Sequence, residues 1–383
     1  MIRVVLLLLI GSLRCLPFSV AQSFPEIRIA IEKKSYQSLQ GSEGMKVNLN
    51  DAAMTINGRA VEVKEMHSRG NNSLNFKRKS LSVDLKKETS VMLEGMSVPL
   101  RKFHLLNLVM DKYSWHNRWA YLNMSALGIF PLHSTYCTLW INDQPQGIFL
   151  LVEKPHEASL RLKSPYMLRR GVQHKIDGEY IDTPSKEEAA GYRKKYQQMY
   201  HNLGRLNGEE LFSALGSALA MEDYFRWMGF NYLIMNGDYS DELYLYIRPG
   251  DGRFDIIPWD YDDIFKPLPH EGSEARGEVD RNRMVFSIED DLDKKIASDP
   301  VIYQYYVEAF KRLCIDLTED QLRKTGQQVL KELEILGRDP RVAEASKFLD
   351  KVSFDMESAK TDLNVAINSV VNRRNAITKN ILK

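Results

Sequence analysis

Short apolar segments dominate the first part of the chain, and apolar residues at helical spacing dominate the second part. Segments rich in β-branched and aromatic residues are typical of strands. Such segments occur at residues 26–32, 45–49, 59–64, 80–85, 135–141 and 147–153. Asn57-Gly58 and residues 142–145 are typical of tight hairpin turns. One helix is predicted within this region, from Ser114, a favourable N-cap, to Gly128, a favourable helix stop.

After Pro155 the pattern becomes helical. Apolar residues recur there at the spacing of one helical face. Helices are predicted at residues 192–200, 209–236, 301–313, 318–336, 341–348 and 358–382. Thr318 and Gln321 fit a capping box at the start of one of these helices.

This change of pattern predicts two lobes joined by a hinge near Glu153. We expect a bilobal α+β fold, with a β-rich N-terminal lobe over residues 22–154 and a helical C-terminal lobe over residues 155–298. Residues 299–383 are expected to extend the C-terminal lobe with further helices.

The N-terminus has the pattern of a secretory signal peptide. A basic Arg3 precedes an apolar run from Val4 to Ile10, and small residues follow at Ser19 and Ala21. We expect cleavage after Ala21, so that residues 1–21 are removed. The apolar run is shorter than the roughly 20 residues that span a bilayer. The mature chain is therefore expected to be exported without a stable membrane span, to the periplasm, the cell surface or the medium.

Composition narrows the possible partners. The chain has 52 Lys and Arg residues and 51 Asp and Glu residues, so its net charge gives no reason to expect nucleic acid as a partner. Only Cys137 and Cys314 follow the predicted signal peptide. They allow one disulfide, but Cys137 lies in an apolar, strand-like run that favours a buried free thiol.

The segment over residues 236–263 carries the most chemistry. Asp238 precedes a predicted β-hairpin, and Asp260, Asp262 and Asp263 follow it directly. A hairpin brings its two open ends together, so we expect these carboxylates to converge in space. Converging carboxylates suit a divalent cation and the positioning of a nucleophile for phosphoryl transfer. If the extended conformation continues after the hairpin, Asp260 and Asp262 point the same way and Asp263 points away.

Three further groups of residues suit phosphate binding. Residues 69–73 form a Gly-containing turn, whose backbone N–H groups can face phosphate oxygens. Lys79 starts a strand after two other basic residues, and Arg118 suits a phosphate or a carboxylate partner. Taken singly, these groups equally fit a surface loop, a hydrated basic run and a structural salt bridge. Their order along the chain, ending in aspartate, hairpin and aspartate, is that of the parts of a protein kinase, although no H-R-D or D-F-G motif is present.

These segments together resemble the CotH-type kinases, named for a bacterial spore-coat protein H. The matching blocks are RGNNS with KSLSVDL, HLLNLVMDKYSWHNRWAYLN, INDQPQGIFLLVEKP, FNYLIMNGDYSDELYLYI and IIPWDYDD. They lie between residues 69 and 263, roughly half of the chain. The family resembles an atypical branch of the protein-kinase fold, so the resemblance implies a bilobal kinase-like fold and ATP as cofactor.

The resemblance also implies a role for each matched position. Lys79 would contact the ATP phosphates, and Glu153 would lie at the hinge beside adenine. Asp238 would be the catalytic aspartate, which orients or deprotonates the acceptor hydroxyl. Asp260, with Asp262 as second choice or co-ligand, would hold the Mg²⁺ or Mn²⁺ that bridges the phosphates. The loop that covers the phosphates would consist of Arg69, Gly70, Asn71, Asn72 and Ser73.

The chain departs from the family pattern at Glu242. Many members have an asparagine near this position, where it binds a second metal, and Glu242 would be a metal ligand that adds charge. Three functions stay open. The first is an exported protein kinase acting on Ser, Thr or Tyr of exported or cell-surface proteins. The second is a non-catalytic pseudokinase or surface scaffold protein, and the third is a nucleotidyl transferase that holds ATP reversed.

Overall fold

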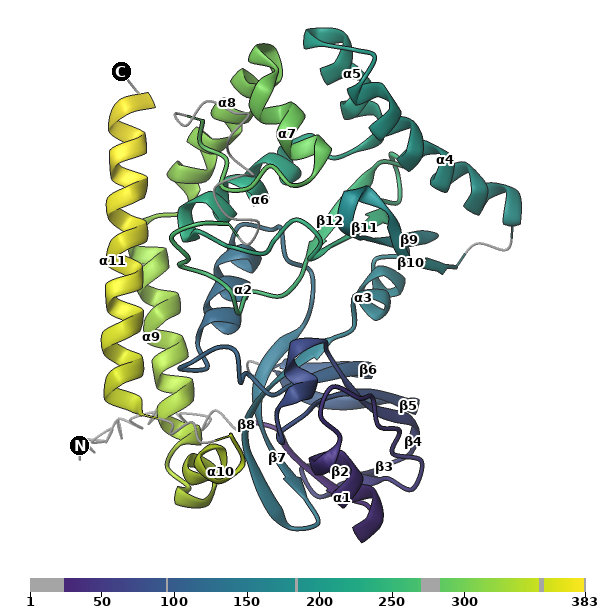
Figure 1. Ribbon diagram of the computed structural model, residues 1–383, viewed down its shortest axis with the longest axis vertical. Helices are drawn as coiled ribbons and strands as arrows, with labels where there is room; N and C mark the ends of the chain where they lie inside the picture. The colour runs from purple at the N-terminus through teal and green to yellow at the C-terminus, as the bar shows by residue number, and fades with distance from the viewer. Residues whose placement is uncertain (1–23, 94–95, 183–184, 270–282, 351–354, 382–383) are drawn as a thin grey trace, which may run out of the picture.

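The computed structural model describes residues 24–93, 96–182, 185–269, 283–350 and 355–381. A β-rich lobe lies at one end of the molecule and a helix-rich lobe at the other (Figure 1). The predicted α+β fold with these two parts is therefore confirmed. The predicted signal peptide lies outside the described residues.

The first lobe is built on an eight-stranded sheet in the order β3-β2-β1-β7-β8-β6-β5-β4. Its strands are β1 (Glu26–Ala30), β2 (Ala53–Ile56), β3 (Arg59–Val61), β4 (Val63–Arg69), β5 (Ser80–Leu93), β6 (Met96–Leu106), β7 (Ser134–Ile141) and β8 (Gln144–Glu153). Helix α1 (Lys33–Gly41) and the 3₁₀ turn η1 (Asn72–Asn75) complete the lobe. Strands β1 and β7 are parallel, and the other neighbouring pairs are antiparallel.

The two faces of this sheet differ, because successive strand residues point to opposite faces. Apolar side chains on one face form a separate buried core. This core includes Leu81, Val83, Phe103, Leu105 and Leu151. The alternate positions form a polar cross-strand row, in which Ser82 of β5 pairs with His67 of β4 and with His104 of β6. His104 makes an edge-to-face contact with Trp259 of the second lobe, at 5.6 Å between ring centroids. The polar face is therefore the one directed at the second lobe.

Several predictions for this lobe need correction. Residues 45–49 are not a strand, since only Asn48 forms a bridge, with His67. Strands β2 and β6 were not predicted, although β6 pairs with both β5 and β8. Pairing with neighbours sets a strand more strongly than local composition does, and β6 contains a proline and three basic residues. The two predicted hairpin turns are confirmed by left-handed backbone at Asn57-Gly58 and Asn142-Asp143.

The second lobe holds a four-stranded sheet in the order β10-β9-β11-β12 and most of the helices. The strands are β9 (Tyr166–Arg170), β10 (Ile176–Ile181), β11 (Leu243–Ile247) and β12 (Phe254–Pro258). The helical elements are α3 (Pro155–Arg161), η2 (Val172–His174), α4 (Lys186–Leu203), α5 (Gly208–Ala218), α6 (Met221–Ile234), α7 (Asp291–Ser298), α8 (Pro300–Asp316), α9 (Glu319–Leu336), α10 (Pro340–Asp350) and α11 (Met356–Ile381). The predicted hairpin is present as β11 and β12, with Leu243 opposite Pro258 and Ile247 opposite Phe254.

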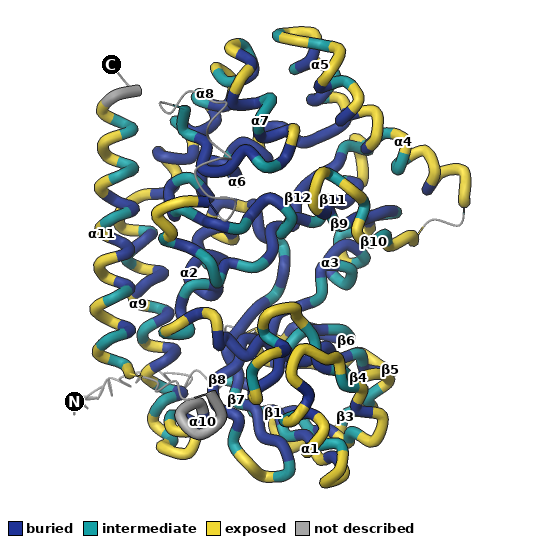
Figure 2. Tube along the Cα trace, viewed as in Figure 1, coloured by how far each residue is buried: buried dark blue, intermediate teal, exposed yellow. Residues whose placement is uncertain are grey.

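The predicted helix over residues 209–236 is in fact two helices, α5 and α6. The break falls at Leu219 and Ala220, where the Ala220 N–H donates to the Phe254 carbonyl at 2.8 Å. The predicted capping box is confirmed, because the Thr318 side chain accepts a hydrogen bond from Gln321 N. Buried positions run through the centre of both lobes, and the outward faces of α4, α9 and α11 are exposed (Figure 2).

Helix α2 (His116–Ala126) belongs to the first lobe by sequence but packs into the core of the second. The predicted cap at Ser114 is wrong, since Ser114 has a φ of +61° and lies before the helix. The buried Asp111 carboxylate takes the capping role instead, accepting from Trp115 N at 3.0 Å and Asn117 N at 3.3 Å. The predicted stop at Gly128 is confirmed by its φ of +76°.

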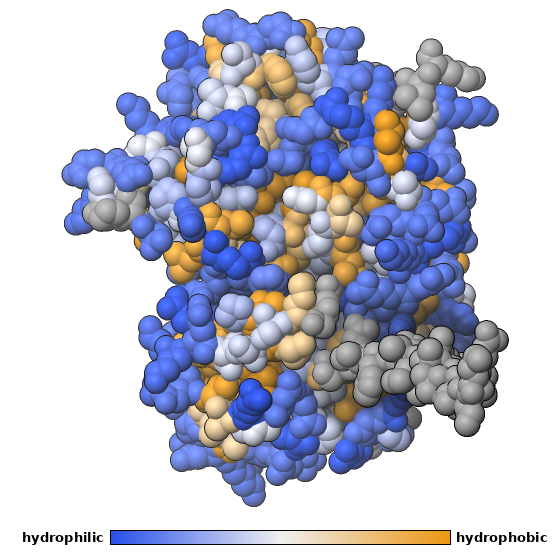
Figure 3. Space-filling model, turned by 180° about the vertical axis from the view of Figure 1, so that it is seen from behind, coloured by the Kyte–Doolittle hydropathy of each residue, from blue (hydrophilic) through white to orange (hydrophobic). Residues whose placement is uncertain are grey.

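The C-terminal helices connect the two lobes. Helices α9 and α11 run side by side along one edge of the molecule (Figure 1), and α9 packs on α2. Helix α10 packs on β8, and the Arg341 guanidinium lies 4.9 Å from the Trp140 ring centre in β7. Seen from behind, hydrophilic residues cover most of the surface and hydrophobic ones lie between them across the middle (Figure 3).

Cys137 and Cys314 are both buried and free. Burial raises the pKa of the Cys137 thiol, and it raises that of Cys314 to about 11. The prediction of a buried free thiol at Cys137 is therefore confirmed. Within the described ranges, no helix has both the length and the apolar character needed to cross a membrane.

Candidate active site

The two segments that flank the hairpin lie against each other. Gly237 N donates to Asp263 O at 2.9 Å, and Phe265 N donates to Ile234 O at 2.9 Å. A Cβ atom at Gly237 would lie 2.6 Å from a carboxylate oxygen of Asp263, so only glycine fits here without a shift. The segments that carry Asp238 and the later aspartates therefore converge, as the hairpin predicted.

Helix α2 holds the second segment in place. Asn117 Oδ1 accepts from Tyr261 N at 2.8 Å, and His116 Nδ1 lies 3.1 Å from Asp262 O. Asp260 has a φ of +42°, in the left-handed region that few side-chain-bearing residues adopt. The extended conformation thus ends at Asp260, so the condition on which the alternation of Asp260 and Asp262 was predicted is not met.

The residues after Asp238 are anchored to the interior. Tyr239 is buried, and its hydroxyl donates to Ser287 O at 2.9 Å. The fully buried Arg170, at the end of β9, donates from Nε to Ser240 O at 2.7 Å. These bonds fix the backbone on the C-terminal side of Asp238 and so limit where its side chain can lie.

Glu242 lies among other carboxylates. Burial and, after it, the charge of Asp260 raise the pKa of Glu242 to about 8. Asp241 and Asp238 act in the same direction, whereas the guanidinium of Arg169 opposes them. Two distant segments of the sequence therefore place their negative charges within electrostatic reach of one another.

Asp262 stands in a still more negative environment. Burial raises its pKa well above the ordinary range, and the charged neighbours that raise it further are Asp260, Asp111, Asp263 and Glu242. A group of carboxylates that disfavour one another's ionisation is a common mark of a functional site. We call Asp111, Asp238, Glu242, Asp260, Asp262 and Asp263 the acid cluster.

Among the described residues, Arg69, Arg169 and Lys266 border the acid cluster. Arg69, the last residue of β4, lies 5.6 Å from the ring centre of Trp259, and its charge lowers the pKa of Asp260 against the effect of burial. Arg169 of β9 donates from one terminal nitrogen to both oxygens of Glu242, at 3.3 Å each. Lys266 pairs with Asp263 at 2.8 Å.

Lys79 donates to backbone carbonyls of its own lobe. The side chain is buried, and its ammonium donates to Ser42 O at 2.8 Å and to Leu74 O. It thereby ties η1 to the loop after α1. The phosphate-contacting role of Lys79 stays a prediction.

The loop after β4 has one position that requires glycine. Gly70 has a φ of +104°, and a Cβ atom there would lie 1.9 Å from Ser73 Oγ. Ser73 Oγ in turn donates to Arg69 O at 3.3 Å, and Asn71 directly precedes η1, which begins at Asn72. The turn is compact and closed on itself, as a loop that covers a ligand must be, but its role towards ATP stays a prediction.

Glu153 lies at the predicted hinge, at the end of β8. Its carboxylate accepts from Arg161 at 2.7 Å and from His133 N at 3.1 Å. These bonds close the connection between β8 and α3. Its position between the lobes agrees with the hinge, and its contact with adenine stays a prediction.

Arg118 is a structural residue. Its guanidinium makes two hydrogen bonds to Glu332 of α9, at 2.9 Å and 3.0 Å, and one to Ser134 O at 2.9 Å. Of its two predicted partners, phosphate and carboxylate, the structure has the carboxylate.

Sequence reasoning missed Asp111, His104 and Arg169. Asp111 was not predicted as the residue that caps α2, because Ser114 has the chemistry of an N-cap and lies closer to the helix. His104 and Arg169 lie on β6 and β9, which were not predicted as strands. Had β6 been predicted as a strand, the alternation of its residues would have placed His104 on the same sheet face as Leu106 and Ser82.

The donor set of the acid cluster suits a hard cation. Carboxylate oxygens are the ligands that Mg²⁺ and Mn²⁺ prefer, and nucleotide-bound Mg²⁺ commonly needs only one or two of them beside the phosphates. In the part of the chain that the structure describes, no group of three or more His, Cys, Asp or Glu side chains is arranged to hold a metal ion. Because a nucleotide-bound metal needs so few protein ligands, Asp260 or Asp262 alone could share such a metal with a nucleotide.

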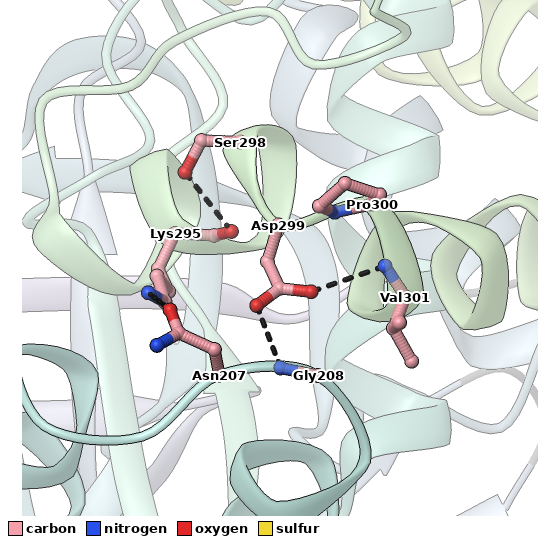
Figure 4. A pocket seen from close by; sticks show the side chains of 7 residues that line it. All are labelled: Asn207, Gly208, Lys295, Ser298, Asp299, Pro300 and Val301. Atoms are coloured by element: carbon pink, nitrogen blue, oxygen red, sulfur yellow. Dashed lines mark hydrogen bonds between the residues drawn. The ribbon is translucent and has the colours of Figure 1, made fainter.

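Two cavities lie away from the acid cluster. One, of about 370 Å³, lies where α5 begins and α7 meets α8 (Figure 4). Its polar groups are satisfied, since Asp299 accepts from Gly208 N at 2.8 Å and Lys295 donates to Asn207 at 2.7 Å. The other, of about 230 Å³, lies beside Arg118. Neither is lined by an acid-cluster residue.

Comparisons with known proteins agree with the kinase-like arrangement. The model of the CotH kinase protein family matches residues 66–365. The crystal structure of the Helicobacter pylori proinflammatory kinase CtkA aligns over 73% of this chain and 94% of that chain, with 9% identity and a TM-score of 0.32. A chain in the complex of the Shewanella oneidensis MR-1 toxin–antitoxin proteins HipA and HipB with operator DNA aligns over 94% of this chain and 75% of its own, with 11% identity and a TM-score of 0.31. A comparison with curated proteins found no match. Both TM-scores are low, so the family of this chain is assigned from the family model alone.

Proposed function

Because this chain belongs to the CotH kinase family, we propose that it transfers the γ-phosphoryl group of ATP to a hydroxyl group of a protein substrate. The observation that carries the proposal is the acid cluster, in which Asp238, Glu242, Asp260 and Asp262 converge from both flanks of one hairpin. Catalysis of phosphoryl transfer depends mainly on positioning and on stabilisation of charge. Both can be supplied by fixed carboxylates and bordering arginines.

In this proposal Asp238 orients the acceptor hydroxyl of Ser, Thr or Tyr. The hydroxyl oxygen forms a bond to the γ-phosphorus while the bond to the β–γ bridging oxygen breaks, and the hydroxyl proton passes to the Asp238 carboxylate. The anchored Tyr239 and Ser240 hold that carboxylate in place. Asp260 and Asp262 would hold Mg²⁺ or Mn²⁺, which would neutralise phosphate charge when bound.

The N-terminal segment with its signal-like pattern supports an exported or cell-surface protein as the substrate. The loop from Arg69 to Ser73 would cover the phosphates, and Glu153 would lie beside adenine. Glu242 is proposed as a further metal ligand or as the partner that keeps Arg169 in place.

A non-catalytic pseudokinase is the second candidate. One observation favours it: Lys79, the lysine expected to contact phosphates, donates to two backbone carbonyls instead. A protein that keeps the fold for binding alone has no need of that contact. Transfer of a nucleotidyl group is a third outcome, which the same experiment separates.

The test is incubation of the purified protein with Mn²⁺ and ATP labelled either on the γ- or on the α-phosphorus. Label from γ-labelled ATP alone, lost in Asp238→Asn, supports the kinase. Label from α-labelled ATP indicates nucleotidyl transfer. Equal labelling of wild type and Asp238→Asn rejects the proposed role of Asp238. No labelling and no rise in melting temperature with millimolar ATP and Mn²⁺ favours the scaffold, since a ligand that binds only the folded state must raise it.

A further inference from the structure

Two arginines approach the acid cluster from opposite lobes. Arg69 ends β4 in the β-rich lobe, and Arg169 lies in β9 of the helical lobe. The Arg69 guanidinium lies 5.6 Å from the ring centre of Trp259, which directly precedes Asp260. Arg169 donates to both carboxylate oxygens of Glu242 at 3.3 Å. A triphosphate lying beside the acid cluster would have a cation on either side.

The hydrogen bonds of Arg169 are incomplete. One terminal nitrogen is shared between the two oxygens of Glu242, and the other lies 4.0 Å from Asp177. Its Nε atom is buried and has no hydrogen-bond acceptor among the described residues. A buried N–H without an acceptor is costly, and a guanidinium is a planar donor group that matches phosphate oxygens.

Lys79, the residue first expected to contact the phosphates, is employed differently. Its ammonium donates to Ser42 O and Leu74 O, and its side chain is only 3% exposed. To reach a phosphate it would have to abandon two carbonyls that lie in the interior of the lobe. Other cations are therefore better placed than Lys79 to supply positive charge to a triphosphate.

We propose that Arg169, held in place by Glu242, binds the triphosphate of the nucleotide from the helical lobe and that Arg69 binds it from the β-rich lobe, in place of Lys79. This inference rests on the proposed function, since it requires ATP as the ligand. Glu242 is then a positioning residue for Arg169. The carboxyl group that distinguishes this chain at Glu242 thus serves to hold the guanidinium beside it.

The test compares binding of ATP and of adenosine by isothermal titration calorimetry, with Mn²⁺ present. Arg169→Gln is expected to weaken ATP binding by about tenfold or more, the usual effect of losing a charge-assisted contact. Adenosine binding should stay unchanged, because adenosine has no phosphates. Arg169→Lys keeps the charge but loses the planar donors, so we expect an intermediate affinity. Arg193→Gln is the matched control, since Arg193 pairs with Glu179 at 2.8 Å and has no contact with the acid cluster among its own hydrogen bonds. It should leave both affinities unchanged.

Two further variants separate the roles of Lys79 and Glu242. Lys79→Met should lower the melting temperature but change the ATP affinity of the folded protein less than Arg169→Gln does. Glu242→Gln should weaken ATP binding without metal, though less than Arg169→Gln does, because the Arg169 guanidinium is then held in place less firmly.

The inference is overturned if Arg169→Gln binds ATP as the wild type does, or if Lys79→Met loses ATP binding at an unchanged melting temperature. Failure of the wild type itself to bind ATP would remove the proposed function and this inference with it. The two failures are thus distinct.

Discussion

Two arginine–glutamate pairs in this molecule differ in how complete they are. Arg118 and Glu332 are joined by hydrogen bonds of 2.9 Å and 3.0 Å, and their side chains are 2% and 0% exposed. Arg169 and Glu242 are joined by two contacts of 3.3 Å, and their side chains are 31% and 19% exposed. Arg118 also bonds Ser134, whereas Nε of Arg169 has no acceptor in the described ranges.

The difference separates structure from function. The complete pair joins α2 to α9 and so ties the C-terminal helices to the segment that holds the acid cluster. The incomplete pair lies inside the acid cluster, where carboxylates outnumber cations. A buried pair that is fully bonded resists change, and removing one partner is costly. A pair whose hydrogen bonds are incomplete, and whose neighbours include more carboxylates than cations, is available to a ligand.

The largest effect is expected on turnover, from a change in the acid cluster, where the incomplete pair lies. Asp238→Asn should lower kcat by about 10²–10⁴-fold, the range typical of a lost general base. The melting temperature should change little, because Asp238 is only partly buried. Initial rates of phosphoryl transfer and thermal melting of the same preparation check this. A fall in melting temperature large enough to explain the lost rate would contradict it.

The next effect is expected on the free energy of unfolding, from a change in the complete pair of Arg118 and Glu332. Glu332→Gln leaves Arg118 buried without its ion partner, which typically costs about 3–5 kcal/mol. Urea denaturation should show this loss, while the ATP affinity of the folded protein stays near that of the wild type. The exposed pair of Arg312 and Glu222 is the control, and Glu222→Gln should cost no more than about 1 kcal/mol. A similar cost for both variants would remove the distinction between the pairs.

A smaller effect is expected from removing one charge of the acid cluster. Asp260→Asn should weaken the binding of Mn²⁺–ATP by roughly 10–100-fold, as loss of metal-site partners commonly does. Without metal and nucleotide it should raise the melting temperature, because Asp260 raises the pKa of Glu242 and Asp262 and so opposes their ionisation. Differential scanning fluorimetry with and without ligand measures both. Destabilisation in both states would mean that Asp260 is structural.

A last effect is expected on the pH dependence of stability. The ordinary pKa of a glutamate is 4.5, and in the folded protein that of Glu242 is about 8. Between these values the folded state binds more protons than the unfolded state, so stability should fall as pH rises from about 4.5 to about 8. Glu242→Gln should flatten this slope, and melting temperatures at a series of pH values test it. An unchanged slope would mean that the pKa of Glu242 is not raised by burial and by the acid cluster.

Local patterns predicted much of this fold. The hairpin of β11 and β12, the turns at Asn57-Gly58 and Asn142-Asp143 and the C-terminal helices follow from turn chemistry and helical spacing, which act over a few residues. The convergence of the segments with Asp238 and Asp263 follows from the hairpin itself. These features depend on contacts that are close in sequence.

Contacts between distant segments could not be predicted in the same way. Strand β6 is set by pairing with β5 and β8, and β9 by pairing with β10 and β11. Arg169 therefore gave no signal as a site residue. The contact between the Lys79 ammonium and Ser42 O, at 2.8 Å, likewise left no trace in the local sequence.

The most direct test of the account is a crystal structure with Mn²⁺ and a non-hydrolysable ATP analogue, with the metal located by its anomalous scattering. The account predicts Mn²⁺ at coordination distance from the carboxylate of Asp260 or Asp262, with Arg169 in contact with the phosphates. Mn²⁺ and nucleotide bound away from the acid cluster, or phosphates held by Lys79 with Arg169 still on Glu242 alone, would contradict it.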